Sequence, residues 1–152
     1  MSNRTPYTST ALEVLTSANL EKGPKGWLAY DTSTSTQSSI TSEVAVTGLT
    51  ETFTTGANRA IRYKCKIRGV STVDQDNLRV RIKRDGTTVA AMDFELDTLG
   101  TDLYVEGHEI GPAAGTYTVT VTVQRSAGTG DVSLGTTTTD HWVLVEDMGP
   151  SS

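Results

Sequence analysis

The stretch that decides the fold runs from residue 59 to residue 68 and reads RAIRYKCKIR. Apolar and basic residues alternate along it. One face carries the apolar side chains of Ile61, Tyr63, Cys65 and Ile67. The opposite face carries the basic side chains of Arg62, Lys64, Lys66 and Arg68. Because side chains alternate between the two faces of a sheet, this pattern predicts a β-strand with one buried and one exposed face.

The same alternation continues downstream. The next predicted strand has an apolar face of Leu78, Val80 and Ile82 and a basic face of Arg79, Arg81 and Lys83. Residues 85–86 then read Asp-Gly, a dipeptide typical of two-residue hairpin turns. We therefore predict that residues 87–96 fold back beside the basic strand. Their exposed side would carry Asp93 and Glu95, and their buried side Ala90, Met92, Phe94 and Leu96.

Further short strands are predicted on both sides of this hairpin, over residues 27–30, 43–47, 51–54, 103–109, 116–124, 132–136 and 141–147. No segment shows a convincing core helix. About eight to ten short strands of this kind are typical of an antiparallel sandwich. We predict an all-β, jelly-roll-like antiparallel β-sandwich over residues 27–150, preceded by an N-terminal arm over residues 1–26. Strand order stays open, since alternation fixes faces and not pairing.

Bulk composition excludes several classes of partner. The chain has 152 residues and a formal net charge of −5, and its sequence pI is near 4.9. This acidic balance gives no overall attraction to nucleic acid or to anionic membranes. No apolar run approaches the ~20 residues of a transmembrane helix. Residues 1–10 lack the apolar core of a secretory signal. We therefore expect neither nucleic acid nor a membrane as a partner.

Residues that could carry catalysis are scattered. His108 and His141 have no nucleophile or acidic partner at a recognisable spacing, and no G-x-S-x-G elbow occurs. Cys65 is the single cysteine, so it cannot form an internal disulfide, and we expect an inert core residue. Residues 74–77 read DQDN but lack the calcium-loop pattern, so a solvated turn is favoured. We expect no enzyme activity, no catalytic residue, no cofactor and no metal site.

A basic stripe is the most prominent surface feature. It forms one outward face if the two basic strands are neighbours, and its members are Arg62, Lys64, Lys66, Arg68, Arg79, Arg81 and Lys83. One interpretation is a solvated face partly neutralised by Asp93 and Glu95, because opposite charges attract across a hairpin. The other is a salt-sensitive contact with an acidic partner protein. Nucleic acid is disfavoured because we expect no aromatic residues interleaved on that face.

Trp27 and Trp142 are the only tryptophans of the chain, and each lies in an apolar stretch. Exposed aromatic side chains can form a platform for a carbohydrate, because each offers a large apolar surface at the boundary with water. Core packing is the favoured fate of at least one of the two. A receptor- or carbohydrate-binding module with a host glycan as ligand is therefore kept as an alternative function.

Two segments at opposite ends of the chain resemble a known family. Residues 15–20 read LTSANL and are followed by PKGW at residues 24–27. Together they resemble an LTAANLN…PRG element near the N-termini of small virion structural proteins of tailed bacteriophages. Residues 142–150 read WVLVEDMGP and resemble the VEDLGP ending of phage minor tail proteins and related β-sandwich virion proteins.

The resemblance implies a virion component, made in the host cytoplasm, that docks on other virion proteins. A minor tail protein is the favoured interpretation, and a capsid decoration or head-fibre protein is the alternative. We expect a homo-oligomer, of which a trimer is one form. The expected interface residues are Leu12, Leu15, Leu20 and Trp27, together with the basic residues Arg62, Lys64, Lys66, Arg79, Arg81 and Lys83.

Overall fold

The computed structural model describes residues 26–135 and 141–151. Within these ranges the chain forms β-strands and no helix. No helix in that part of the chain could therefore cross a membrane. Residues 1–25, nearly all of the predicted arm, lie outside the described residues. The strands are β1 (Gly26–Ser33), β2 (Val44–Thr55), β3 (Arg59–Ser71), β4 (Asp76–Arg84), β5 (Thr87–Leu96), β6 (Thr101–Ile110), β7 (Gly115–Ala127), β8 (Val132–Leu134) and β9 (His141–Pro150).

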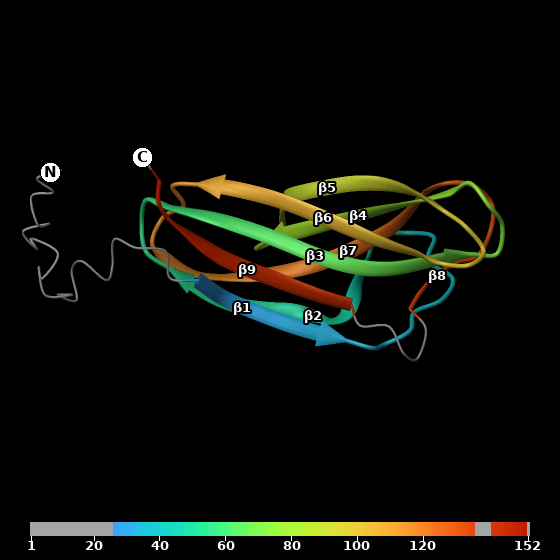
Figure 1. Ribbon diagram of the computed structural model, residues 1–152, viewed down its shortest axis with the longest axis horizontal. Helices are drawn as coiled ribbons and strands as arrows, with labels where there is room; N and C mark the ends of the chain where they lie inside the picture. Colours follow the sequence, from blue (N-terminus) through green and yellow to red (C-terminus); the bar gives the residue numbers. More distant parts are fainter. Residues whose placement is uncertain (1–25, 136–140, 152) are drawn as a thin grey trace, which may run out of the picture.

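The strands form two antiparallel sheets that pack face to face (Figure 1). The first sheet has the order β1-β9-β3-β6, with β8 also paired to β3, and the second has the order β2-β7-β4-β5. Pairing is nested: β4 pairs with β5, β3 with β6, β2 with β7 and β1 with β9. Successive nested pairs lie in alternate sheets, which is the topology of a jelly roll. The predicted jelly-roll-like sandwich is therefore confirmed.

The core lies between the two sheets and is made of the apolar faces that alternation predicts. β3 contributes four side chains that are at most 1% exposed: Ile61, Tyr63, Cys65 and Ile67. β4 and β7 contribute six more with no exposed surface: Leu78, Val80, Ile82, Val119, Val121 and Val123. All three are inner strands of their sheets, so they form the centre of the sandwich. Removing their apolar surface from water stabilises the fold by about 25 cal/mol per Å².

The hairpin between β4 and β5 turns at the predicted dipeptide. Asp85 and Gly86 both have positive φ, at 46° and 80°. These values fit a type I′ turn, whose twist matches that of the flanking strands. The turn places Arg79 opposite Asp93, and the two side chains form an ion pair at 2.7 Å. The predicted charge pairing across the hairpin is confirmed for Asp93, whereas Glu95 faces an asparagine instead.

The predicted buried side of β5 is only partly correct. Leu96 is buried, but Ala90 and Phe94 are half-buried and Met92 is 50% exposed. β5 is an edge strand, with a hydrogen-bonded neighbour on one side only. An edge position leaves inward-facing side chains partly uncovered, since no strand shields their outer flank. Alternation alone cannot show which strand occupies the edge.

The C-terminal strand β9 lies inside the first sheet, between β1 and β3. Asp147 is buried and accepts hydrogen bonds from the Arg59 guanidinium of β3 at 2.7 to 3.1 Å. It also accepts one from the Gly149 N–H at 2.9 Å. The preceding residue, Glu146, accepts a hydrogen bond from Arg62 at 2.8 Å. The segment that resembles the phage ending thus fixes β9 against β3, which is a structural role.

Candidate functional site

The basic residues of the sequence stripe lie on two opposite surfaces of the molecule. β3 belongs to the first sheet and β4 to the second, so the two strands are not neighbours within a sheet (Figure 1). In a sandwich, the outward side chains of the two sheets point away from each other. The condition for a single basic face is therefore not met.

On the second sheet, the basic residues of β4 are paired with acidic side chains. Arg79 pairs with Asp93, and the hydrogen bond from Arg79 lowers the pKa of Asp93. Arg81 and Lys83 both contact Glu43, Arg81 at 3.3 Å. The hydrogen bond from Lys83 is the main cause that lowers the pKa of Glu43. Beside this charge cluster, β7 presents three threonines in register with β2 or β4: Thr118, Thr120 and Thr122.

On the first sheet, Arg62 and Lys64 of β3 are paired with acids from the neighbouring strands. Glu146 of β9 lies 2.8 Å from Arg62 and 3.4 Å from Lys64. The hydrogen bond from Arg62 is the main cause that lowers the pKa of Glu146, so this carboxylate stays ionised. Lys64 also lies 3.9 Å from Glu106 of β6. Both cations of this row are therefore engaged by carboxylates.

The other two basic residues of β3 share one carboxylate. Asp102 of β6 lies 3.3 Å from Lys66 and 3.2 Å from Arg68. The outer face of the first sheet thus opposes the four cations of β3 with three carboxylates. This arrangement supports the interpretation of a partly neutralised face. The neutralising acids, however, come from β6 and β9 and not from Asp93 and Glu95.

Two aromatic side chains flank Lys66 on this outer face. Lys66 faces Tyr104 of β6 on one side and Trp142 of β9 on the other. The two rings lean together over β3, with centroids 6.4 Å apart and planes at 60°. The expectation that no aromatic residue is interleaved with the basic ones is therefore wrong. Alternation within β3 could not reveal them, because they come from strands distant in the sequence.

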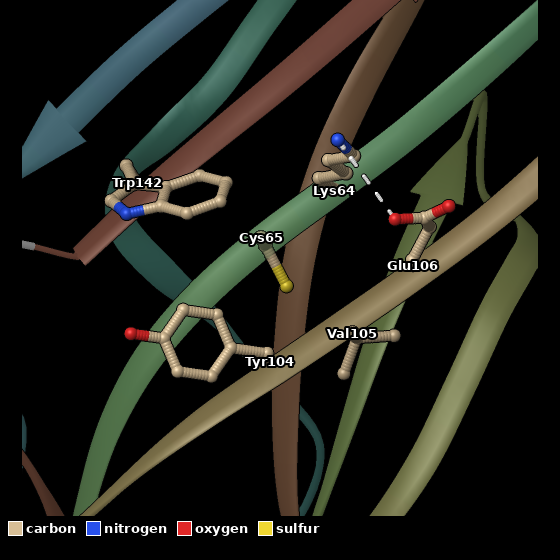
Figure 2. Close-up of a pocket in the computed structure, with 6 residues that line it drawn as sticks. All are labelled: Lys64, Cys65, Tyr104, Val105, Glu106 and Trp142. Atoms are coloured by element: carbon tan, nitrogen blue, oxygen red, sulfur yellow. Dashed lines mark ion pairs between the residues drawn. The ribbon is translucent and has the colours of Figure 1, made fainter.

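A hollow of about 310 Å³ lies beside this aromatic pair. In Figure 2 the Trp142 and Tyr104 rings bound one side of the hollow, and the Lys64–Glu106 ion pair bounds the other. Its volume is at the small end of the roughly 300–1,000 Å³ of small-molecule sites. Its lining consists of Lys64, Cys65, Tyr104, Val105, Glu106 and Trp142. One wall is aromatic and the other offers hydrogen-bonding groups, so the hollow suits a ligand with one apolar side and several hydroxyls.

A second aromatic pair lies on β1, at the edge of the same face. The ring centroids of Trp27 and Tyr30 are 5.3 Å apart. Trp27 is 66% exposed and Tyr30 48% exposed, while Tyr104 is 57% exposed and Trp142 is half-buried. The expectation that at least one tryptophan packs in the core is therefore wrong. Both project from the outer side of the first sheet, whose inward positions are taken by smaller apolar residues.

Cys65, His108 and His141 differ in their burial and in their contacts. Cys65 is buried as predicted, and burial raises the pKa of its thiol to about 12. His141 is buried and its Nδ1 accepts a hydrogen bond from the backbone N–H of Arg68 at 3.1 Å. His108 is exposed and lies 3.3 Å from Glu106. Ser33 of β1 is the cross-strand neighbour of His141.

The acidic segment at residues 74–77, whose second half opens β4, is held by protein donors. Asp76 is 1% exposed and accepts hydrogen bonds from the Ser71 hydroxyl and, at 3.2 Å, from the Gly130 N–H. Asp74 accepts one from the Thr98 N–H at 3.1 Å. The expected solvated turn is thus wrong for Asp76. Within residues 26–135 and 141–151, no group of three His, Cys, Asp or Glu side chains could hold a metal ion.

The predicted interface residues divide into two sets. Leu12, Leu15 and Leu20 lie outside the described residues, so their docking role stays a prediction. Trp27 is described and exposes most of its ring. The basic members lie on the two separate faces described above, Arg62, Lys64 and Lys66 on the first sheet and Arg79, Arg81 and Lys83 on the second.

Comparison with known proteins finds distant structural likenesses. No protein-family model and no curated protein matches the chain. Among solved structures, a carbohydrate-binding module in complex with calcium and xylotriose is 15% identical, with a TM-score of 0.42, over 78% of this chain and 99% of that one. The sugar-binding C-terminal domain of EclA is 16% identical, with a TM-score of 0.42, over 74% and 78%.

A virus structure is similar to the same degree. The infectious bursal disease virus Gx strain structure is 15% identical, with a TM-score of 0.42, over 84% of this chain and 42% of that one. Likenesses this distant carry no argument about function.

Proposed function

We propose that this chain is a non-catalytic saccharide-binding domain that takes its ligand on the outer face of the first sheet. The observation that carries the proposal is the Tyr104–Trp142 pair beside a hollow whose opposite wall is the Lys64–Glu106 ion pair. A sugar ring presents C–H groups on its faces and hydroxyls around its rim. The arrangement offers a matching surface to each.

The apolar half of the interaction comes from the two rings. Tyr104 is more than half exposed, and its ring lies edge to face against Trp142. Covering such a ring with the C–H face of a sugar removes apolar surface from water on both partners. Aromatic side chains with few rotatable bonds also lose little entropy on binding. Tyr104 and Trp142 are therefore expected to supply most of the affinity.

The polar half comes from Lys64 and Glu106. The Lys64 ammonium can donate to a sugar hydroxyl, and the Glu106 carboxylate can accept from one. Hydrogen bonds to charged groups are stronger than those between neutral groups. The ammonium and carboxylate lie 3.9 Å apart, which leaves hydrogen-bonding capacity on each for a ligand. This pair is expected to set which sugar is preferred.

The same residues argue against glycoside hydrolysis. A glycosidase needs two carboxyl groups on either side of the scissile bond, one of them with a raised pKa. Glu106 and Glu146 both contact Lys64, so the ammonium lies between them. The pKa of Glu146 is lowered by its bond with Arg62, which is opposite to what a general acid requires. The pair suits binding and not bond cleavage.

A glycan array followed by calorimetry tests the proposal on the full chain. We expect a neutral saccharide ligand whose affinity falls about tenfold or more in Tyr104→Ala and in Trp142→Ala, as for aromatic binding hot spots. Thr120→Ala, on the outer face of the second sheet, is the matched control and is expected to bind like the unaltered chain. Absence of any saccharide ligand, or equal binding by all three variants, would show that the proposal is wrong.

The second candidate function is a structural role in the virion of a tailed bacteriophage, as a minor tail protein or as a capsid decoration or head-fibre protein. The resemblance of residues 15–27 and 142–150 to virion proteins favours it. Trp27, at the end of the first segment, exposes an apolar ring that another chain could cover. In this role the chain would be located in the virion and would form homo-oligomers. A virion protein can also carry a saccharide site, so the two roles are compatible.

Deletion of residues 1–25 tests the structural role. We expect the truncated chain to keep the circular dichroism spectrum of the sandwich but to lose its oligomeric state, measured by light scattering behind size exclusion. The full chain at low and high salt is the control. A truncated chain that assembles like the full one would contradict docking through the arm.

A further inference from the structure

The two aromatic pairs lie on the same outer face of the first sheet. Trp142 of β9 is in register with Thr32 of β1, and Leu144 of β9 is in register with Tyr30. Tyr30 is therefore the diagonal neighbour of Trp142 on the same face. Diagonal neighbours on adjacent strands lie about 7–8 Å apart, within reach of aromatic side chains. The rings thus lie in sequence from Tyr104 on β6 to Trp142 on β9 and then to Tyr30 and Trp27, which follow each other along β1.

This series of rings, which we call the aromatic track, crosses the whole sheet. It begins on β6, passes over β3 and β9, and ends on β1. Three strand spacings of about 4.8 Å separate the outer strands, or about 14 Å in all. The first step of the track is 6.4 Å between ring centroids and the last is 5.3 Å. A single sugar ring covers one or two of these aromatic rings, so only a chain of sugars could contact all four.

The residue between the two pairs is an apolar one that its neighbours cover. Leu144 lies between Tyr30 and Lys64 in register and is only 9% exposed. On β9, Leu144 is the residue that follows Trp142 on the outer face, so no charged side chain of β9 separates the row of Trp142 from that of Tyr30.

Charge on the flanks favours a neutral ligand. The cations of β3 that border the track are engaged by Asp102, Glu106 and Glu146. A polyanion such as a single-stranded nucleic acid would have to compete with these carboxylates for every contact. A neutral oligosaccharide can form hydrogen bonds with both the cations and the carboxylates, and it does not have to displace either.

From this geometry we propose that the aromatic track binds a linear neutral oligosaccharide that runs diagonally across the first sheet. Tyr104 and Trp142 form one subsite, and Tyr30 and Trp27 form a second. The inference rests on the proposed saccharide-binding function and adds to it the length of the ligand and the direction in which it lies. Binding strength should rise with ligand length until both subsites are filled.

The chain carries a built-in reporter for each subsite, because its only two tryptophans are Trp142 and Trp27. Trp142→Phe leaves a single tryptophan in the β1 subsite, and Trp27→Phe leaves a single one in the β6–β9 subsite. Phenylalanine keeps an apolar ring at each place. Tryptophan fluorescence of the two variants is titrated with mono-, di- and hexasaccharides of glucose, mannose, xylose and N-acetylglucosamine. Single-stranded oligothymidylate serves as the polyanion control.

A short saccharide should change the fluorescence of Trp142 alone, whereas a hexasaccharide of the same sugar should change both tryptophans and bind about tenfold tighter, as linked subsites do. If mono- and hexasaccharides bind equally and Trp27 never responds, the extended track is wrong while the saccharide site survives. If no saccharide changes either tryptophan, the proposed function and the track both fail. If oligothymidylate gives the larger response, the ligand class is wrong.

Discussion

The outer faces of the two sheets have similar charges but different uncharged residues. Each carries a row of basic residues, on β3 or on β4, that is paired with carboxylates from neighbouring strands. Between its charges the second sheet presents small threonines of β7, whereas the first presents four aromatic rings. A surface of paired charges and small side chains is an ordinary soluble surface. Large apolar side chains gathered on one face mark an interaction surface, on which we propose that a saccharide binds.

The largest expected effect concerns the strand that carries Trp142. Asp147→Asn should destabilise the fold by about 3–5 kcal/mol, because it removes one partner of a buried, bidentate ion pair. Chemical denaturation monitored by circular dichroism measures the loss. Asp93→Asn, which breaks an exposed pair on the second sheet, is the matched control. Equal stability of the two variants would contradict the view that β9 depends on the buried pair.

The next largest effect separates the two faces by binding alone. Tyr104→Ala should remove most of the saccharide affinity while the free energy of unfolding changes little, since the ring is exposed. Thr118→Ala on the second sheet should change neither quantity. Calorimetry and denaturation on the same preparations give both values. A large loss of stability in Tyr104→Ala would mean that the ring contributes to the packing of the fold, which would contradict a role in binding alone.

The sequence predicts one half of this comparison better than the other. Alternation within residues 59–68 and 78–83 correctly predicts which side chains are buried, and Asp85-Gly86 correctly predicts the hairpin. The aromatic track could not be predicted, because Tyr104, Trp142 and Tyr30 come from strands whose adjacency depends on sheet order. Alternation gives the face of a residue but not its cross-strand neighbour. For the same reason, β3 and β4 could not be assigned to opposite sheets.

A moderate effect is expected with pH, and it should involve both faces. The folded-state pKa values of Glu146 and Glu43 lie below their ordinary value of 4.5, owing to hydrogen bonds from Arg62 and Lys83 respectively. A carboxylate with a lowered pKa stabilises the fold fully above its unfolded pKa, and that contribution is lost as the pH falls through the folded pKa. The Tm should therefore stay level from pH 7 to about 5 and fall below about 4.5.

Two substitutions assign that acid sensitivity to one face or the other. Glu146→Gln removes the pH-dependent stability that the first sheet contributes, and Glu43→Gln removes that of the second. Each variant should show a shallower decrease of Tm below pH 4.5 than the unaltered chain, in scanning calorimetry at low ionic strength. Unchanged decreases in both variants would show that these pairs do not couple stability to pH.

The smallest effect is expected for the exposed hairpin pair. Asp93→Asn should cost about 0.2–1 kcal/mol, as exposed cross-strand ion pairs do. The double variant with Arg79→Gln should cost little more than either single change, because each removes the same contact. Denaturant titration gives the free energy of unfolding of the three variants and so completes the double-mutant cycle. A loss above about 2 kcal/mol would contradict the interpretation of the second sheet as an ordinary charged surface.

The central claim is that the first sheet, and not the second, receives a saccharide. Amide chemical shifts of the full ¹⁵N-labelled chain, titrated with the tightest saccharide of the array, test it most directly. The account predicts that the largest shifts cluster at residues 64–66, 104–106 and 142–144 and at the two tryptophan side-chain N–H groups, while residues 79–83 and 118–122 stay still. Shifts concentrated on β4 and β7, or absent from both faces, would contradict it.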